Sequence, residues 1–289
     1  MTNLFVESLI SGITLGAVYA VIAMGLCLVY GVSKIFNFAH GTMFTLGAYF
    51  AWLCIHKLHL NYGLTFIIVL PVMFGIGLAF ERLVIHPLRW KSDWQFTTII
   101  ATLATAILLE NLIQIVFNPR TKMLPPIVEG NLEFHGYVMS RHEVIIFFVA
   151  IAIIVLIQIY LSKAKTGMAA RAVSQDISGA QIVGIKVDRL FSITFAISVV
   201  LAAIGGILMG SKFFVSPLGG WVPLIKGFII VAFGGLGSIP GTLYSAFILG
   251  IFEAMVTQYV GALWIFPFWT LLFILVLTFR PRGLLGTWS

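Results

Sequence analysis

Five residues whose side chains could hold protons, bind ions or form hydrogen bonds lie inside long apolar runs of this sequence. Glu110 and Gln114 are four residues apart and share a helix face, with Asn111 beside Glu110 in "ATAILLENLIQIVF". Lys226 opens "KGFIIVAF", and Glu253 stands in "ILGIFEAMV". Buried ionisable groups are costly in a membrane and usually face a partner within the bundle. For Glu110, Asn111 and Gln114 we expect a hydrogen-bonded network between helices, with a proton relay as the alternative. Snorkelling toward an interface is the alternative for Lys226 and Glu253.

Two interruptions of the apolar pattern also carry polar chemistry. The first is "KIFNFAHG", residues 34–41, which places Lys34, Asn37 and His40 before Gly41. The second is "GGLGSIPG", residues 234–241, whose four Gly and one Pro cannot continue a regular helix. Either stretch is an ordinary interfacial turn or a broken helix lining a transport path. Paired Gly/Pro interruptions in the two halves of a chain favour the transport path.

These residues are positioned by membrane-spanning elements. The 289 residues are 60% hydrophobic and 9% charged, with a mean hydropathy of +1.08, which excludes an ordinary soluble domain. Six runs lack Asp, Glu, Lys and Arg: 8–33, 58–80, 144–162, 190–211, 227–252 and 254–279. Each reaches about the 18–20 residues that cross a bilayer core as a helix. The segments lack the alternation of a membrane β-barrel, so we expect helices.

The fold class predicted is therefore an all-α polytopic membrane protein, a single transmembrane domain over 1–289. About 8–9 spanning helices are expected, some of them broken. Their ranges are near 4–30, 41–56, 62–85, 95–117, 144–161, 190–210, a broken stretch 223–258, and 263–279. The G-x-x-x-G pairs Gly12/Gly16 and Gly206/Gly210 predict close helix packing, by default within the bundle.

The loop charges predict the orientation. Alternation places on one side Arg82, Arg89, Lys91, Lys163, Lys165, Arg171, Lys186, Arg189, Arg280 and Arg282. The other side receives Lys57, Arg120, Lys122, Arg141 and Lys212, so the first side is cytoplasmic by the positive-inside rule. The loop 118–143 is then external, and the side of the N-terminus stays open. The net charge of +7 is accounted for by topology and does not indicate nucleic acid.

The sequence predicts no bond-breaking chemistry. Cys27 and Cys54 lie in apolar segments far from metal-ligating partners, so no metal site is expected. No paired carboxylates or activated nucleophile indicate an intramembrane enzyme. The chain has no G-x-x-x-x-G-K-[ST] phosphate loop. If transport is driven by ATP, a separate subunit must bind the nucleotide.

The segment 162–189 predicts a short amphipathic helix. Ala169, Val173, Ile177 and Ala180 form a narrow apolar stripe, and Gly184 suits a C-terminal cap. Such a helix lies on the lipid surface or docks into a partner protein. Small residues make poor lipid anchors, so the stripe favours a protein partner.

The chain resembles the integral membrane permeases of branched-chain amino-acid ABC importers. The resemblance covers nearly the whole length and is carried by four blocks in order. They are "GITLGAVYAVIAMGLCLVYGVSKIFNFAHGTMFTLGAY" (12–49), "TGMAARAVSQDISGAQIVGIKVDRLFSITFAIS" (166–198), "KGFIIVAFGGLGSIPGTLYSAFILGIFEA" (226–254) and "FRPRGLLG" (279–286). It implies a type II-like ABC importer permease fold with broken helices, in the bacterial inner membrane. It also implies a second, similar permease subunit, two cytoplasmic ATPase subunits that use ATP and Mg, and a periplasmic solute-binding protein.

The resemblance assigns roles by position. It implies a translocation path near Asn37, Phe38, His40, Gly41, Thr42, Gly234, Gly235, Gly237 and Ser238. It implies an ATPase-coupling segment with Gly167, Arg171, Ala172, Asp176, Ala180, Gly184 and Ile185. Thr42 replaces the acidic residue usual after the "NFAHG" glycine. Branched-chain amino acids are the expected substrates, with urea, amides or aromatic acids as alternatives within the family. An ATP-independent transporter or channel using Glu110 or Glu253 is the main rival.

Overall fold

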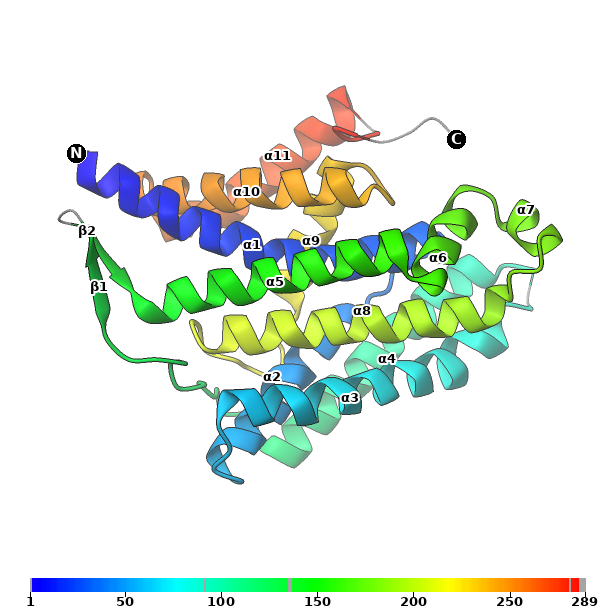
Figure 1. The fold of residues 1–289 in the computed structure, drawn as a ribbon, viewed down its shortest axis with the longest axis horizontal. Helices are drawn as coiled ribbons and strands as arrows, with labels where there is room; N and C mark the ends of the chain where they lie inside the picture. Colours follow the sequence, from blue (N-terminus) through cyan, green and yellow to red (C-terminus); the bar gives the residue numbers. More distant parts are fainter. Residues whose placement is uncertain (1, 91, 135–136, 281, 286–289) are drawn as a thin grey trace.

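The computed structural model describes residues 2–90, 92–134, 137–280 and 282–285, and shows a bundle of long α-helices (Figure 1). The helices are α1 (Thr2–Ser33), α2 (His40–His56), α3 (Tyr62–Phe80), α4 (Trp94–Phe117), α5 (Arg141–Lys163), α6 (Lys165–Gln175), α7 (Ile177–Ile182), α8 (Val187–Gly210), α9 (Trp221–Gly234), α10 (Ile239–Tyr259) and α11 (Ile265–Phe279). A π-helical turn η1 (Glu81–Ile85) and a 3₁₀ turn η2 (His86–Leu88) extend α3, and the 3₁₀ turn η3 (Ala262–Trp264) precedes α11. Strands β1 (Asn131–Phe134) and β2 (Tyr137–Ser140) pair antiparallel.

The predicted fold class is confirmed. Within the described residues, seven helices are long and apolar enough to cross a membrane: α1, α3 with its turns, α4, α5, α8, α10 and α11 with η3. The apolar helix α9 is shorter, and so is α2. We call α2 and α9 half-helices, because each is shorter than the seven spanning helices. Every spanning helix was expected from the sequence within a few residues of its observed bounds, whereas the hairpin inside 118–143 was not.

The bundle has two ends of different character (Figure 1). One carries α6 and α7, and we call it the basic end because Lys163, Lys165, Arg171 and Lys186 lie on these helices or beside them. The other carries β1 and β2, and we call it the hairpin end. The first turns of α1 lie at the hairpin end, opposite to the basic end.

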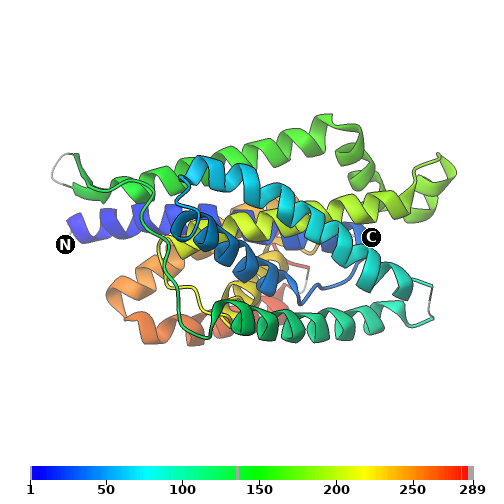
Figure 2. The ribbon, with the colours of Figure 1, turned by 90° about the horizontal axis from the view of Figure 1, so that it is seen from below.

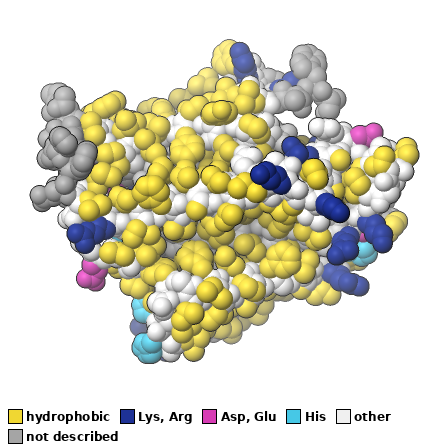
Figure 3. All heavy atoms as spheres, viewed as in Figure 1, with side chains coloured by type: hydrophobic (Ala, Val, Ile, Leu, Met, Phe, Trp, Pro, Cys, Tyr) yellow, Lys and Arg dark blue, Asp and Glu magenta, His cyan; other side chains and the backbone are white. Residues whose placement is uncertain are grey.

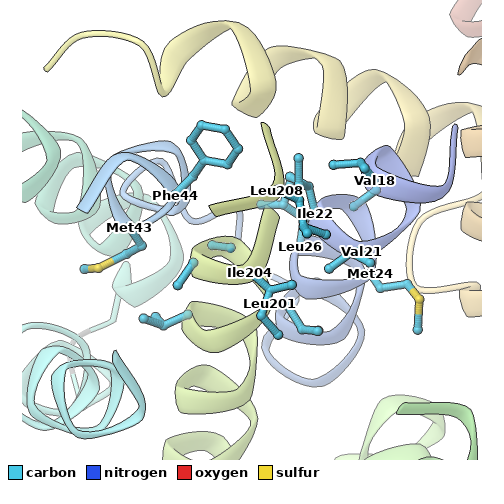
Figure 4. Close-up of a cluster of buried hydrophobic side chains, with 14 of the residues drawn as sticks. Val18, Val21, Ile22, Met24, Leu26, Met43, Phe44, Leu201, Ile204 and Leu208 are labelled. Atoms are coloured by element: carbon cyan, nitrogen blue, oxygen red, sulfur yellow. The ribbon is translucent and has the colours of Figure 1, made fainter. Parts of the chain in front are cut away.

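Helices α1 and α8 form the centre of the core. In Figure 2 they lie between α5 and α4, and in Figure 4 the side chains of Ile22 on α1, Phe44 on α2 and Leu208 on α8 converge. The predicted close packing of the glycine pairs is confirmed. A Cβ on Gly16 would lie 2.8 Å from a backbone carbon of α10, and one on Gly206 would lie 2.0 Å from a backbone oxygen of α2.

The exterior of the bundle suits lipid. Hydrophobic side chains cover most of the face in Figure 3, and the Lys and Arg side chains gather mainly toward the basic end. The apolar windows of α3, α4, α5 and α11 are mostly unburied within the chain, whereas those of α1 and α8 are mostly buried. A mostly apolar exterior that is not buried in the chain requires lipid or another membrane protein around it.

Candidate functional site

The first predicted interruption is a re-entrant segment. Helix α1 ends at Ser33 at the basic end, and Lys34 adopts a left-handed conformation with φ of 58° that turns the chain. Helix α2 then begins at His40, whose ring lies 3.2 Å from the backbone oxygen of Ile22. Since an α-helix rises 1.5 Å per residue, Ile22 lies about 16 Å from the end of α1. Residues 34–39 therefore run without helical structure inside the bundle.

Hydrogen bonds from neighbouring groups stabilise this segment. The Asn37 Oδ1 accepts from the backbone N–H of Ala39 at 3.0 Å, and the N–H of Phe38 donates to the Thr102 Oγ1 at 3.3 Å. Non-helical backbone at membrane depth needs such partners or a wet cavity. Asn37 is 2% exposed, and its Nδ2 has no hydrogen-bond partner among the described residues. Of the two interpretations of 34–41, the broken helix describes this geometry.

The hydrogen-bond partners of the His40 side chain lie on neighbouring helices. Its side chain is fully buried, with Nε2 near the oxygen of Ile22 and Nδ1 3.3 Å from the Ser198 Oγ. These contacts join α2 to α1 and to the middle of α8. His40 is therefore bonded to neighbouring helices of its own chain. Phe38 is partly buried and its ring lies 5.5 Å from that of Phe228 on α9.

A second half-helix meets the first one, and sequence reasoning missed it. Residues 211–220 lead from the end of α8 back into the bundle, where α9 starts at Trp221. A Cβ on Gly41 would lie 2.4 Å from the oxygen of Gly220, so the first turns of α2 and α9 are in direct contact. The signal available was "SPLGG", residues 216–220, which reads equally well as a surface loop.

Glu110 lies at this junction. Its buried side chain interacts with the side chains of Trp221 and Thr42, in the first turns of α9 and α2. A carboxylate there also benefits from the positive ends of two helix dipoles. Asn111 does not join this group, because it is exposed and donates to Ile107 of its own helix at 2.7 Å. The expected network of three residues is thus reduced to Glu110, while Gln114 is partly buried.

The second predicted interruption, residues 234–241, does not lie inside the bundle as residues 34–39 do. Gly235 and Gly237 have φ of 107° and 84°, and the Ser238 side chain caps α10 by accepting from the N–H of Gly241 at 3.3 Å. Gly237 lies against Gly31 in the last turn of α1, so this turn is at the basic end. The interpretation of 234–241 as a helix broken at membrane depth is therefore wrong. The interruption at depth in this half is 211–220.

Packing explains the glycines of this turn. A Cβ on Gly234 would lie 2.4 Å from the backbone of Gly241, so α9 and α10 need both glycines to approach. Residues 284–285 cap the C-terminal end of α9. The N–H of Leu284 donates to the oxygen of Phe233 at 2.7 Å, and that of Leu285 donates to the oxygen of Gly234 at 3.0 Å. These two bonds satisfy carbonyl groups that a helix end leaves open.

Two cavities lie at opposite ends of α1, each between α5 and α10. The basic-end cavity has a volume of about 720 Å³ and is lined by α1, α5, α6 and residues 236–240. Of the predicted path residues it contains Gly237 and Ser238, and of the coupling residues Arg171. The hairpin-end cavity, of about 490 Å³, is lined by α1, α5, α10 and residues 212–213. Between them, residues 17–26 of α1 are buried and line neither cavity.

A buried ion pair joins four helices beside the hairpin-end cavity. The Lys226 ammonium of α9 donates to both carboxylate oxygens of Glu253 on α10, at 2.7 and 2.8 Å. Tyr19 of α1 and Trp269 of α11 each donate to the Glu253 Oε2 at 2.9 Å. Snorkelling is therefore excluded for this pair. Glu253 is already held by three partners, which does not favour its use as an ion site.

The segment 162–189 forms two helices with a bend at Asp176. The Asp176 side chain accepts from the N–H of Ser178 at 2.9 Å and caps α7. Gly184 has φ of 84°, and the N–H of Ile185 donates to the oxygen of Ala180. Together with the bond from Gly184 to Gln181, this is a Schellman C-cap, as Gly184 predicted.

The apolar stripe of this segment faces its own chain. Val173 and Ala180 are buried with Ala170 in a small core formed with α1 and α8. The expectation that the stripe faces a partner is wrong for these residues. The outward surface instead carries Ile182 and Val183, which are 86% and 76% exposed. The other coupling residues divide between both surfaces: Gly167 is buried, Ala172 and Ile185 are partly buried, and Arg171, Asp176 and Gly184 are exposed.

The family model and the curated relatives point to one family. The family model described as "Branched-chain amino acid transport system / permease component" matches residues 8–279. The branched-chain amino acid permease protein BraD of Pseudomonas aeruginosa is 31% identical over 98% of this chain and 96% of its own length. LivH of Escherichia coli K12 is 29% identical with the same coverage. The solved structure of PsaBC from Streptococcus pneumoniae in complex with Fab aligns over 97% of this chain and 92% of that chain, with a TM-score of 0.48 and 16% identity.

Proposed function

The chain belongs to the branched-chain amino acid transport permease family, and from this premise we propose that it forms half of the translocation path of an ABC importer in the bacterial inner membrane. Its substrates are branched-chain or related amino acids, delivered by a periplasmic binding protein. The observation that carries the proposal is the pair of cavities at opposite ends of α1. A permease that alternates between two open states needs access from each side and a closed region between them.

The path follows α1 between α5 and α10. The hairpin-end cavity is the entrance, where Ser8, Ser11 and Thr257 supply hydroxyl groups. The basic-end cavity is the exit, beside Gly237 and Ser238. The buried middle of α1 is the barrier in this state. A second permease subunit, packed on the same face, closes the path from the membrane side.

The re-entrant segment has a supporting role in this proposal. Asn37, His40, Gly41 and Thr42 are buried in the core and line neither of these two cavities. Gly41 lets the first turn of α2 pack against that of α9, and His40 joins α2 to α1 and α8 behind the path. The Nδ2 of Asn37, which has no partner among the described residues, is the group here that is poised to bind a solute if the junction opens.

The basic end is cytoplasmic by the positive-inside rule, and the ATPase subunits dock there. This chain binds neither ATP nor Mg, which belong to those subunits. The docking surface is the outer side of α6 and α7, centred on Ile182 and Val183. Large apolar side chains outside the membrane and this exposed are typical of a helix that inserts into a groove of a partner.

Blocking each cavity tests the path. The permease would be reconstituted in proteoliposomes with its second permease, ATPase and binding-protein subunits, and ATP-dependent leucine uptake measured. Ser11→Trp at the hairpin end and Ser174→Trp at the basic end should lower uptake to background. Ile107→Trp, on the exposed side of α4, is the matched control and should transport normally. Normal uptake by both cavity variants would refute the path. Uptake of another solute in place of leucine would correct the substrate alone.

A further inference from the structure

A third cavity lies at the basic end, between the end of α3 and the start of α8. Its volume is about 580 Å³. It shares no residue with the two cavities along α1. The lining residues come from three short stretches: Phe74 and Leu78; Glu81, Arg82 and His86; and Asp188, Arg189, Ser192 and Ile193. The proposed transport path does not use this site.

The two acidic residues of the cavity, Glu81 and Asp188, are both paired with one cation, Arg89. Arg89 forms ion pairs with Glu81 and with Asp188, the latter at 2.9 Å. The Ser192 hydroxyl also donates to Glu81. The Arg89 guanidinium in addition lies 4.5 Å from the ring centre of Phe191, which fixes its position. With Arg82 and Arg189 included, three arginines face two carboxylates here, so the site carries a net positive charge.

Arg82 and Arg189 are the available cations. Both side chains are exposed, and neither makes an ion pair in the described part of the chain. They lie on different helical elements, η1 and α8, on the rim of the same cavity. His86 of η2 adds a third nitrogen-bearing side chain, which is partly buried. Two guanidinium groups at one opening are suited to a phosphate.

The floor of the cavity is apolar and extends into the depth of the membrane. Leu78 and Phe74 precede Arg82 on α3 by about one and two helical turns, roughly 6 and 12 Å along the axis. Ile193 follows Arg189 by about one turn on α8. The cavity is therefore charged at the basic end and becomes hydrocarbon-like toward the bilayer centre.

We propose that this cavity binds one anionic phospholipid of the cytoplasmic leaflet. Arg82 and Arg189 hold the headgroup phosphate, and the first part of an acyl chain lies along Phe74, Leu78 and Ile193. Basic pockets between membrane helices on this side match such headgroups. A partner protein docking at the basic end cannot fill the apolar floor, because the floor lies at lipid depth. A free phosphate would use the arginines but not the floor.

Lipid exchange measured by native mass spectrometry tests this proposal. The purified full-length protein would be titrated in mild detergent with phosphatidylglycerol and, separately, with phosphatidylcholine of the same acyl chains. Wild type should retain one phosphatidylglycerol in preference to phosphatidylcholine. Arg82→Gln/Arg189→Gln should bind it about 30-fold more weakly, given the typical contribution of a basic residue near an anionic surface. Lys163→Gln/Lys165→Gln removes equal charge outside the cavity and should bind as wild type does.

Two controls make the result decisive. Inorganic phosphate should not displace the bound lipid, since it cannot occupy the apolar floor. Phe74→Ala should weaken binding of the phospholipid without changing its preference for an anionic headgroup. The proposal is overturned if wild type shows no preference for phosphatidylglycerol, a result that needs no variant to fold. Equal loss of binding in the two double variants would also overturn it, because the attraction would then be general.

Discussion

Removing the charge of Glu253 should strongly destabilise the bundle. In Glu253→Gln the Lys226 ammonium stays buried without its counter-ion, while the amide oxygen can still accept from Tyr19 and Trp269. Breaking one partner of a buried ion pair costs about 3–5 kcal/mol. For a chain of this size that corresponds to a decrease in Tm of roughly 10 °C. Lys226→Met/Glu253→Gln removes the unpaired charge and should recover most of the loss.

Thermal unfolding in mild detergent, followed with a thiol-reactive fluorophore, measures this effect. Cys27 and Cys54 are both buried, so they react only when the bundle opens. Glu143→Gln is the matched control, since its pair with Lys212 is partly exposed and is worth about 0–1 kcal/mol. If Glu253→Gln unfolds at the same temperature as Glu143→Gln, the buried pair does not stabilise the junction of the four helices.

Three further outcomes follow from the geometry. Gly206→Ala should destabilise the protein by about 1–3 kcal/mol through overpacking in the same thermal assay. Gly75→Ala should not, because an added Cβ there meets no atom within 4 Å. His40→Ala should cost about 1–3 kcal/mol because two buried groups lose their partner, and normal stability would show that the ring is dispensable. Ile182→Asp should abolish the stimulation of ATPase activity by loaded binding protein, while Ser178→Asp, on the same helix, should preserve it; equal activity in both would refute docking through α7.

Much of the fold could be predicted because membrane helices leave a local signal. Charge-free runs mark the spans, and the seven long helices found among the described residues follow them closely. The interruption at Lys34 to Gly41 was visible because polar residues and Gly there stand between two apolar runs. In each case the information lies within about twenty neighbouring residues, the length that a bilayer imposes.

The sites required tertiary information. Lys226 and Glu253 lie on different helices, and Tyr19 and Trp269 contact them from two more. The spacing of these four residues in the sequence therefore could not predict that they form one hydrogen-bonded group. The re-entry of 211–220 was missed because a loop of that length can remain at the surface or descend. The stripe through Val173 and Ala180 was recognised, but periodicity identifies a face without saying what covers it.

The linkage between α5 and α6 indicates how the proposed docking at the basic end would act on the proposed path. Only Ala164 separates the two helices, and a Cβ on Gly167 would lie 2.2 Å from the oxygen of Tyr160, so α6 packs tightly against the end of α5. Helix α6 also receives a bond from Lys34 to the oxygen of Ser174. A force on α7 therefore acts on both α5 and the end of α1, the two helices that line each cavity with α10. Because α1 is held in the core by α8, we expect α5 to move, and its displacement would open the closed region beside α1.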